Sequence, residues 1–346
     1  MEKRPTSHDV ARAAGVSQST VSFVFTGRAG ISPATRQKVL TAAAELNYRP
    51  NLAARSMRTR RTGRLAVVVP IATLTPLTLL PGAIAAAQEE GYVVEVVSLP
   101  HQMTERDERL AELIGSGQYE GVLSFTPLPS AHAGSGPARE LRADPRPEEG
   151  EPDQVVVLAV AEFDDDMHSA GALADALPIV TMMEHLAAGG QRRFLHLAGP
   201  RDFRSSLARR EAYLATIERL GLESLGVIDG DWSGRSGEDA VNALPDGILP
   251  VAVIAANDLI ATGALRAATR RGWRVPEDLT LTGWDDHPQS AFLAPSLTSV
   301  RQDRERLGAH SMHRLIAAVR GLPAPPAPTD LLRVVWREST GPVPAA

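Results

Sequence analysis

Apolar residues near the amino terminus recur at intervals of three and four, which is the spacing of an amphipathic helix. In residues 7–25 this spacing predicts two short helices, with Ser7 and Ser17 as their amino-terminal caps. Gly15 stands between them, where a left-handed residue would end the first helix. A third helix is expected over residues 32–47, because a Ser-Pro pair opens it and an apolar stripe follows. Together the three helices can close a small core.

From residue 65 the pattern changes to short apolar runs that alternate with amphipathic stretches. Such alternation is typical of a parallel sheet with helices on its faces. The expected strands are residues 65–70, 93–99, 121–125 and 155–160, then 192–200, 225–232, 251–258, 279–286 and 331–340, and residues 296–303 lead into the last helix. The expected helices are residues 76–91, 105–119, 175–190, 206–221, 259–273 and 304–321. Two doubly wound α/β lobes result. They resemble the periplasmic-binding-protein architecture, whose ligand lies between the lobes at the carboxyl ends of the strands.

One segment of the body breaks this alternation. Residues 126–153 include nine Pro or Gly among 28 positions, and few of the others are apolar. Such a composition predicts an exposed loop or insertion rather than part of the sheet.

The net charge differs strongly between the amino-terminal region and the rest of the chain. The formal net charge of the whole chain is −5. Residues 1–64 hold 12 Lys or Arg against 3 Asp or Glu, a net of +9, so the remainder carries −14. A basic arm on an acidic body indicates that the arm meets a polyanion.

Composition excludes several classes of protein. The chain has no cysteine, which excludes disulfides, thiol nucleophiles and cysteine-bound metals. It has no apolar run of about 18 residues and its amino terminus is polar, so neither a membrane span nor a secretory signal is expected. These features predict a cytoplasmic protein.

The second predicted helix is polar on the side away from its core. Two helices joined by a short turn with Gly form the helix-turn-helix, which reads DNA with its second helix. Hydroxyl and amide side chains on that helix are of the types that hydrogen-bond base edges and phosphates. A small helical hairpin packed on a globular body is the alternative interpretation of this stretch alone.

The segments GVSQSTVS, ISPATRQKV, LNYRPN and AARSM follow one another in this order. In them the chain closely resembles the lactose/galactose repressor family of bacterial transcription regulators. The resemblance implies a helix-turn-helix domain over residues 1–50, a hinge over 51–63, and a two-lobed effector-binding and dimerisation domain over 64–346. In that family the hinge folds on DNA and levers an apolar side chain into the minor groove. Here the hinge helix would span residues 51–58, with Met57 as the wedge.

The resemblance also assigns the contacts to DNA. It implies contacts from Thr6, Ser17, Gln18, Ser19, Thr20, Ser22, Phe23, Tyr48, Asn51, Ala54 and Met57. Of these, Gln18, Ser19 and Phe23 match the base-contacting positions. Phe23 stands where an arginine is common. An aromatic ring can pack on a thymine methyl but cannot pair with guanine, so a weaker guanine preference is expected there.

In the body, the resemblance points to side chains near the ends of strands. It implies effector contacts from Arg209, Trp232, Asn257, Asp258, Trp284 and Asp285. Polar groups of these types hydrogen-bond hydroxyls, while an aromatic ring packs on the apolar face of a sugar. The alternative is that the tryptophans belong to the core and the aspartates cap helices.

Two pocket loops depart from the family pattern. The loop over residues 70–82 lacks the usual aromatic pair, and residues 162–178 do not align with the usual acidic site. The identity of the effector, including whether it is a sugar, therefore stays open.

Catalytic and metal-binding motifs are weak in this sequence. The acidic run over residues 164–166 is typical of a solvated loop, and His310 and His313 have no acidic partner between them. There is no glycine-rich phosphate loop and no serine in a nucleophile elbow. We therefore expect no cofactor, no metal and no enzymatic activity.

The sequence as a whole predicts a helical DNA-binding headpiece, a hinge and a two-lobed α/β sensor. The expected function is repression through palindromic operator DNA. A small, carbohydrate-like effector, held by residues of both lobes with Arg209 and Asp285 among them, would control it. A homodimer through the α/β body is expected, because two hinges must meet on one operator and no leucine heptad tail follows the last strand. A solute-binding protein and an α/β enzyme are the alternatives.

Overall fold

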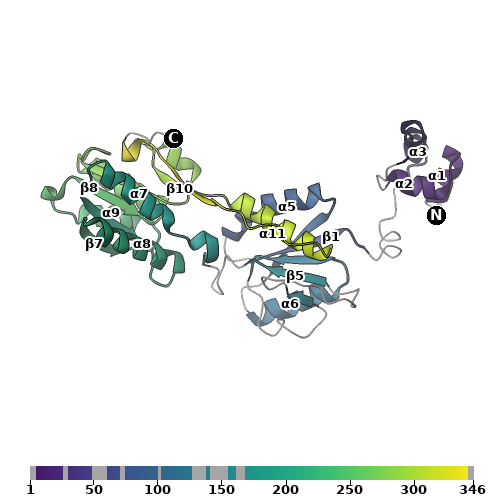
Figure 1. Ribbon diagram of the computed structural model, residues 1–346, viewed down its shortest axis with the longest axis horizontal. Coiled ribbons are helices and arrows are strands. Elements are labelled where there is room, and N and C mark those ends of the chain that lie inside the picture. The colour runs from purple at the N-terminus through teal and green to yellow at the C-terminus, as the bar shows by residue number, and fades with distance from the viewer. Residues whose placement is uncertain are drawn as a thin grey trace. The chain divides into compact units, whose positions relative to one another are not determined.

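The computed structural model describes residues 5–25, 30–48, 61–70, 75–99, 103–126, 138–140, 155–160 and 168–341. The chain separates into two compact units, residues 1–63 and 64–346, and each is described by itself (Figure 1). The predicted hinge helix, with Asn51, Ala54 and Met57, lies outside the described residues, as does the acidic run over residues 164–166.

The described residues of the headpiece form α1 (Ser7–Ala14), α2 (Gln18–Phe25) and α3 (Pro33–Glu45). Their inner faces meet in one aliphatic core, made of Val10, Ala11, Val21, Val24, Val39, Ala42 and Ala43. Gly15 has a φ of 65°, the left-handed conformation in which α1 ends and the chain turns toward α2. The predicted helical fold of this region is confirmed, with α3 ending at Glu45, slightly before the expected boundary.

The amino-terminal caps of these helices are set by short side chains. Thr6 caps α1, so the expectation of Ser7 as the cap is wrong. The reason is a reciprocal capping box, in which Asp9 N donates to Thr6 Oγ1 at 3.4 Å and Thr6 N donates to Asp9 Oδ2 at 2.9 Å. Ser17 Oγ accepts from Thr20 N at 3.1 Å and caps α2 as expected.

The first lobe is built on a parallel sheet with the strand order β2-β1-β3-β5-β4. Its strands are β1 (Arg64–Pro70), β2 (Val93–Leu99), β3 (Gly121–Ser124), β4 (Ala138–Glu140) and β5 (Val155–Ala159). Along β1, Leu65, Val67 and Val69 enter one core and Ala66 and Val68 enter another. Both faces of the sheet are covered, which explains why this strand is apolar without interruption.

Helices cover both faces of this first sheet. They are α5 (Leu80–Glu89), α6 (Met103–Gly115) and α11 (Arg304–Val319), with the 3-10 turn η1 (Thr75–Leu79) before α5. β4 lies inside the segment that was expected to be a loop, and it pairs in parallel with β5 at the sheet edge. A strand at the edge of a sheet forms backbone hydrogen bonds with one neighbouring strand only. A short segment without a continuous apolar pattern can therefore occupy this position.

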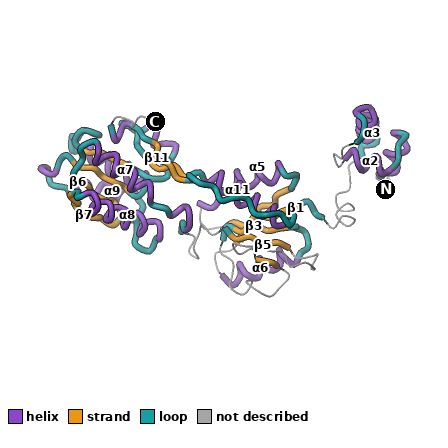
Figure 2. Tube along the Cα trace, viewed as in Figure 1, coloured by secondary structure: helices purple, strands orange, loops and turns teal. Residues whose placement is uncertain are grey.

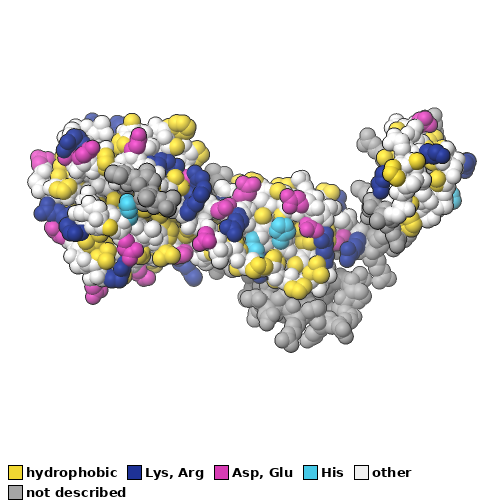
Figure 3. Space-filling model, turned by 45° about the horizontal axis from the view of Figure 1, so that its top comes forward, with side chains coloured by type: hydrophobic (Ala, Val, Ile, Leu, Met, Phe, Trp, Pro, Cys, Tyr) yellow, Lys and Arg dark blue, Asp and Glu magenta, His cyan; other side chains and the backbone are white. Residues whose placement is uncertain are grey.

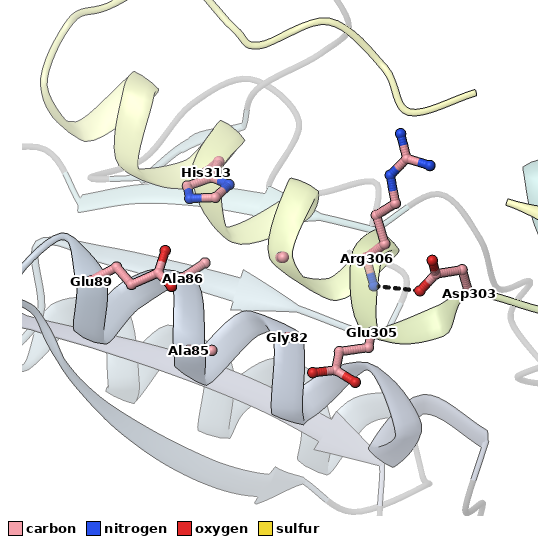
Figure 4. A pocket seen from close by; sticks show the side chains of 9 residues that line it. Gly82, Ala85, Ala86, Glu89, Asp303, Glu305, Arg306 and His313 are labelled. Carbon is pink, nitrogen blue, oxygen red and sulfur yellow. Dashed lines mark hydrogen bonds between the residues drawn. The ribbon is translucent and has the colours of Figure 1, made fainter. Parts of the chain in front are cut away.

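The helix α11 lies near the carboxyl end of the chain, after all the strands of the second sheet. It nevertheless packs on the first lobe, beside α5 (Figures 1 and 4). Two glycines make the close crossing possible. A Cβ on Gly82 would lie 1.8 Å from the carbonyl oxygen of Glu305, and one on Gly308 would lie 2.0 Å from that of Leu79. At the amino end of α11, Asp303 Oδ1 accepts from Arg306 N at 3.0 Å and caps the helix.

The second lobe is built on a parallel sheet with the strand order β7-β6-β8-β9. Its elements are α7 (Leu177–Ala188), β6 (Arg193–Ala198), α8 (Arg204–Leu220), β7 (Glu223–Asp229), α9 (Gly234–Asn242), β8 (Val251–Ala255), α10 (Asp258–Arg270) and β9 (Leu279–Thr282). Separate buried clusters lie on its two faces, one with α9 and α10 and the other with α7 and α8. The predicted pair of parallel α/β sheets is confirmed.

The last two strands belong to neither large sheet. β10 (Ser299–Gln302) and β11 (Leu332–Val335) pair with each other in an antiparallel ribbon, visible in Figure 2. Short 3-10 turns complete the fold: η3 (Gly171–Ala174), η4 (Asp246–Ile248), η5 (Pro288–Phe292) and η6 (Glu338–Thr340). Within the described ranges, no helix has both the length and the apolar character needed to cross a membrane.

Candidate functional site

The outer side of α2 forms a polar surface opposite the headpiece core. Ser17, Gln18 and Ser19 are exposed, and Thr20, Ser22 and Phe23 are half-buried. Gln18 Nε2 donates to Ser7 Oγ of α1 at 2.9 Å, which orients the amide before any ligand is bound. On the face shown in Figure 3, basic side chains outnumber acidic ones on the headpiece, whereas both signs are mixed over the body.

Two further contacts hold α2 in place. Arg36 Nη1 of α3 donates to Val24 O at 3.1 Å, at the carboxyl end of α2. Tyr48 is half-buried and meets the Phe25 ring edge-on, with ring centroids 5.8 Å apart. Of the other predicted DNA contacts, Thr6 is exposed at the start of α1, where it also caps that helix.

In the second lobe, Arg209 lies in the first half of α8 with only 5% of its surface exposed. Its guanidinium stacks on the Trp284 ring, 3.9 Å from the centroid, and lies 5.9 Å from the Trp232 centroid. Arg209 Nη1 donates to Ala256 O at 2.6 Å, but Arg209 Nε is buried with no partner in the described part of the chain. Burial lowers the pKa of Arg209 to about 10, and the charge of Asp285 opposes that shift.

Trp232 follows β7 in a left-handed conformation, with a φ of 66°. Its ring lies against Gly199, where an added Cβ would come within 2.2 Å of the ring. Asn257 holds the backbone of this residue, because Asn257 Nδ2 donates to Trp232 O at 3.1 Å. Trp232 Nε1 is buried without a hydrogen-bond partner among the described residues.

Three of the predicted contacts have their polar groups or rings turned into the protein. Trp284 is fully buried in the core. Asn257 caps α10, accepting from Ile260 N at 2.7 Å. The Asp258 carboxylate is also buried, and accepts from His287 N at 2.7 Å, Ser290 Oγ at 2.6 Å and Ser299 Oγ at 2.5 Å. The alternative interpretation of core tryptophans therefore describes Trp284. The residue that caps α10 is Asn257 rather than an aspartate, and Asp258 ties the loop after β9 to α10.

Asp285 follows β9 in a strained left-handed conformation, with a φ of 101°. Its side chain keeps 42% of its exposure, although protein atoms crowd around it. That crowding raises the pKa of Asp285, while Arg209 and Arg304 oppose the increase. Arg304 Nη2 lies 3.3 Å from Asp285 Oδ1. An accessible carboxylate is suited to accept hydrogen bonds from a ligand.

The next residue, Asp286, anchors this strained turn. Its side chain is 2% exposed and forms ion pairs with Arg301 and Arg337, each at 2.5 Å. Asp286 N donates to Ser299 Oγ at 2.9 Å. Asp285 is therefore held by contacts to the ribbon strand β10 and to the segment after β11.

Several residues near Trp232 and Asp285 were not predicted from the sequence. The rings of His168 and Phe203 stack with centroids 3.7 Å apart, and Phe203 meets Trp232 edge-on at 5.3 Å. Phe203 stands immediately before α8, so its place in the loop after β6 was a usable signal. Arg304 had no such signal, since its contact with Asp285 depends on how β10 returns beside β9.

All six predicted effector residues belong to the second lobe. They lie on the elements around the sheet of β6 to β9, and any residues of the first lobe that share the ligand with Arg209 and Asp285 stay a prediction. The loops after β1, β3 and β5 include residues 71–74, 127–137 and 161–167, which lie outside the described residues. Within the described ranges, no group of three His, Asp or Glu residues could hold a metal ion.

A helix-turn-helix headpiece joined to two parallel α/β sheets defines a class of DNA-binding regulators with a periplasmic-binding-protein-like sensor. Residues 6–51 match the family described as "Bacterial regulatory proteins, lacI family", and residues 183–340 match the "Periplasmic binding protein-like domain". The chain belongs to the lacI family. It is a DNA-binding transcription regulator, a repressor with an effector-binding domain, and not an enzyme.

Two relatives match along nearly the whole chain. The lactose operon repressor of Escherichia coli (strain K12) is 30% identical over 332 residues, which cover 92% of this chain and 86% of the repressor. The HTH-type transcriptional regulator CelR of Thermobifida fusca is 33% identical over 339 residues, covering 92% of this chain and 93% of CelR.

Solved structures show the same fold. The lac repressor dimer bound to operator and the anti-inducer ONPF has a TM-score of 0.64 at 26% identity, covering 98% of this chain and 99% of that one. A complex of the transcriptional regulator CelR with cellobiose has a TM-score of 0.55 at 30% identity, covering 97% and 100%.

Proposed function

We propose that this repressor is controlled by a carbohydrate-like effector that binds at the carboxyl edge of the second lobe, against Arg209, Trp232 and Asp285. The observation that carries the proposal is unused hydrogen-bonding capacity. Arg209 Nε and Trp232 Nε1 are both buried with no partner in the described residues, and the Arg209 guanidinium carbon lies 5.9 Å from the Trp232 ring centroid. Buried donors of this kind are rare in folded proteins and call for a missing partner.

The chemistry of the surroundings supports a sugar. The Trp232 ring offers an apolar face, and the Asp285 carboxylate offers an acceptor for hydroxyls. The similarity to CelR, solved as a cellobiose complex, points in the same direction. In this arrangement Trp284, Asn257 and Asp258 act as positioning residues, which hold Arg209, Trp232 and the loop after β9.

On the DNA side, α2 enters the major groove and presents Gln18, Ser19 and Phe23 to base edges. The other exposed polar side chains of the headpiece contact the sugar-phosphate backbone of the DNA. The hinge residues Asn51, Ala54 and Met57 fold on the operator, and Met57 enters the minor groove. The similarity to a lac repressor dimer solved on its operator supports this mode of binding.

The active form is a homodimer on a palindromic operator. Apolar side chains stand exposed on the described surface of the second lobe, with Phe292 88% and Leu259 60% exposed. The edge strand β2 of the first lobe exposes Val93 and Val96 as well. Large exposed apolar side chains and an open strand edge mark surfaces that another chain covers. Light scattering at micromolar concentration should give the mass of two chains, and a monomer would contradict this proposal.

The effector site is tested by measuring operator affinity with and without ligand. A thermal-shift screen of sugars, beginning with glucose, lactose and cellobiose, first finds a ligand. The variant Asp285→Asn removes the charge and one acceptor, while Asn tolerates the left-handed φ. It should bind operator nearly as well as the wild type but lose the ligand response, which typically corresponds to about 1–3 kcal/mol of coupling.

The matched control is Asp239→Asn, because Asp239 is an exposed aspartate of α9. This variant should keep both operator affinity and the ligand response. A normal ligand response in Asp285→Asn would show that the effector site lies elsewhere.

A further inference from the structure

We infer that Ser7 is a specificity-determining residue of the headpiece, which positions the Gln18 amide so that it reads adenine. This inference rests on the proposed contact of Gln18 with a base edge, and it adds the base that is read and the residue that positions the reader. The grounds are the hydrogen bond between the two side chains and the donors that this bond leaves for DNA.

The Ser7 hydroxyl is available to α2 because another residue caps its own helix. Thr6 caps α1 through reciprocal hydrogen bonds with Asp9, and Thr6 Oγ1 also donates to Asp9 Oδ2 at 2.7 Å. Ser7 is the first residue of the helix, and its Oγ accepts from Gln18 Nε2 at 2.9 Å. This distance is typical of a well-formed N–H···O hydrogen bond. The bond therefore joins the start of α1 to the start of α2.

Packing beneath the two side chains holds the helices that carry them. Val10 of α1 and Val21 of α2 are buried in the same headpiece core. Gly15 ends α1 in the left-handed conformation and closes the short turn between the helices. The distance between Ser7 and Gln18 is therefore set by two packed helices, and rigid elements hold a recognition group more precisely than loops do.

Gln18 depends on α1 more than its neighbours in α2 do. Ser17 Oγ lies 2.7 Å from Ser19 Oγ and 2.8 Å from Thr20 Oγ1, so these hydroxyls are held within their own helix. The hydrogen bond of the Gln18 side chain instead crosses to Ser7. A glutamine side chain has many rotamers, and ordering it on binding costs free energy. The bond to Ser7 reduces that cost because it orders the amide before DNA arrives.

The same hydrogen bond changes what Gln18 offers to DNA. A glutamine amide has two N–H donors and one carbonyl acceptor. When one N–H donates to Ser7, the second N–H and Oε1 remain for DNA. Adenine presents the complementary pair in the major groove, since its N7 accepts and its N6 amino group donates. Guanine presents two acceptors, N7 and O6, so Gln18 Oε1 would face an acceptor there.

The test is a selection of randomised operator half-sites by the full-length protein, followed by fluorescence anisotropy at one fixed salt concentration. The wild type should fix an adenine at the base pair whose preference disappears in Gln18→Ala. Ser7→Ala releases the second donor of Gln18, so guanine should become acceptable at that base pair. Operator affinity of Ser7→Ala should fall about two- to tenfold, the usual range for the loss of one hydrogen bond.

Further variants separate positioning by Ser7 from a direct contact of Ser7 with DNA. Ser7→Thr keeps the hydroxyl and should restore the adenine preference. In the Gln18→Ala background, Ser7→Ala should cause no further loss of affinity, because the residue that Ser7 positions is already absent. Thr41→Ala is the matched control, since it removes a hydroxyl from an exposed residue of α3 and should change neither preference nor affinity. Thermal unfolding of Ser7→Ala should match the wild type, because Thr6 still caps α1.

Four outcomes oppose the inference. If Ser7→Ala keeps the adenine preference and the affinity that Gln18→Ala loses, Ser7 does not position Gln18, and Gln18 remains a base reader. If Ser7→Ala weakens binding equally with and without Gln18, Ser7 contacts DNA itself and the inference fails. If the wild type fixes a guanine at this base pair, the amide donates where an acceptor was inferred, and the inference fails. If Gln18→Ala changes the preference at no base pair, the proposed base contact of Gln18 fails and this inference fails with it.

Discussion

The headpiece and the second lobe hold their candidate functional residues in opposite ways. On α2, Ser17, Gln18 and Ser19 are exposed, and the helix packs through Val21 and Val24 on its other side. In the second lobe, the candidate residues Arg209, Asn257 and Asp258 are almost fully buried and bond to the protein itself. The candidate residues lie apart from the core in the headpiece, whereas in the lobe the candidate residues themselves belong to the packed interior.

The difference follows from the size of the ligand. DNA is a large charged surface that binds to the outside of a helix, so the contacting side chains need no burial. A small molecule is held in a recess, whose polar groups must be buried and fixed by neighbours. Substitutions in the headpiece should therefore change binding alone, and substitutions in the second lobe should change stability as well.

The largest effect is expected for Asp258→Ala. The substitution leaves three donors without an acceptor, two of them buried serine hydroxyls, which should lower the free energy of unfolding by about 3 kcal/mol or more. Urea denaturation of the sensor transition measures it, with Asp239→Ala as an exposed control that should stay near the wild type. Wild-type stability in Asp258→Ala, with loss of ligand binding, would make Asp258 a contact residue and break the comparison.

A second effect in the lobe depends on pH. His196 lies in the centre of β6, and burial lowers the pKa of His196 from 6.5 to about 4. The folded protein holds the neutral ring, while the unfolded chain takes up a proton below pH 6.5. This stabilising contribution is therefore complete above pH 6.5 and is lost as the pH falls toward 4, by roughly 3 kcal/mol in total.

Urea midpoints at pH 7.5 and pH 4.5 measure the contribution of His196. The variant His196→Gln can still donate to Ile254 O, which lies 2.8 Å from His196 Nδ1, but does not titrate. It should lose less stability between the two pH values than the wild type. Equal losses in the two proteins would assign the pH dependence to other groups.

In the headpiece, Gln18→Ala should weaken specific operator binding by about 1–3 kcal/mol, because one amide contact to a base edge is lost. Non-specific DNA binding and thermal stability should hardly change, since Gln18 is exposed. Fluorescence anisotropy with operator and scrambled DNA gives both affinities. Gln37→Ala, an exposed glutamine of α3, is the control. A clear loss of stability in Gln18→Ala would show that the headpiece also couples recognition to folding.

The smallest effect in free energy is expected for Phe23→Arg, which should change preference more than affinity. An arginine at this position can pair with guanine, so a selection from randomised half-sites should fix a guanine that the wild type does not require. If both proteins select the same half-site, Phe23 does not read that base, and its half-buried ring serves the headpiece fold instead.

Local pattern was sufficient for most of the fold. The helical spacing in residues 7–25, Gly15 as the end of α1, and the apolar runs of β1 and β8 all predicted the elements that form. Periodicity decides these elements because each depends on near neighbours and on which faces are buried. The short side-chain caps follow from the same local rules. The cap of α1 is Thr6 instead of the predicted Ser7, which places the start of that helix one residue away from the prediction.

Only the tertiary structure decided which candidate side chains are buried and which are accessible. The sequence assigned one role to Trp232, Trp284, Asp258 and Asp285 together, yet Trp284 and Asp258 are buried while the side chain of Asp285 is 42% exposed. It also held no signal that Arg304 would lie beside Asp285, or that residues 138–140 would add an edge strand. Those outcomes depend on contacts between residues distant in sequence. Chain packing sets such contacts, and the pattern along a single segment does not encode them.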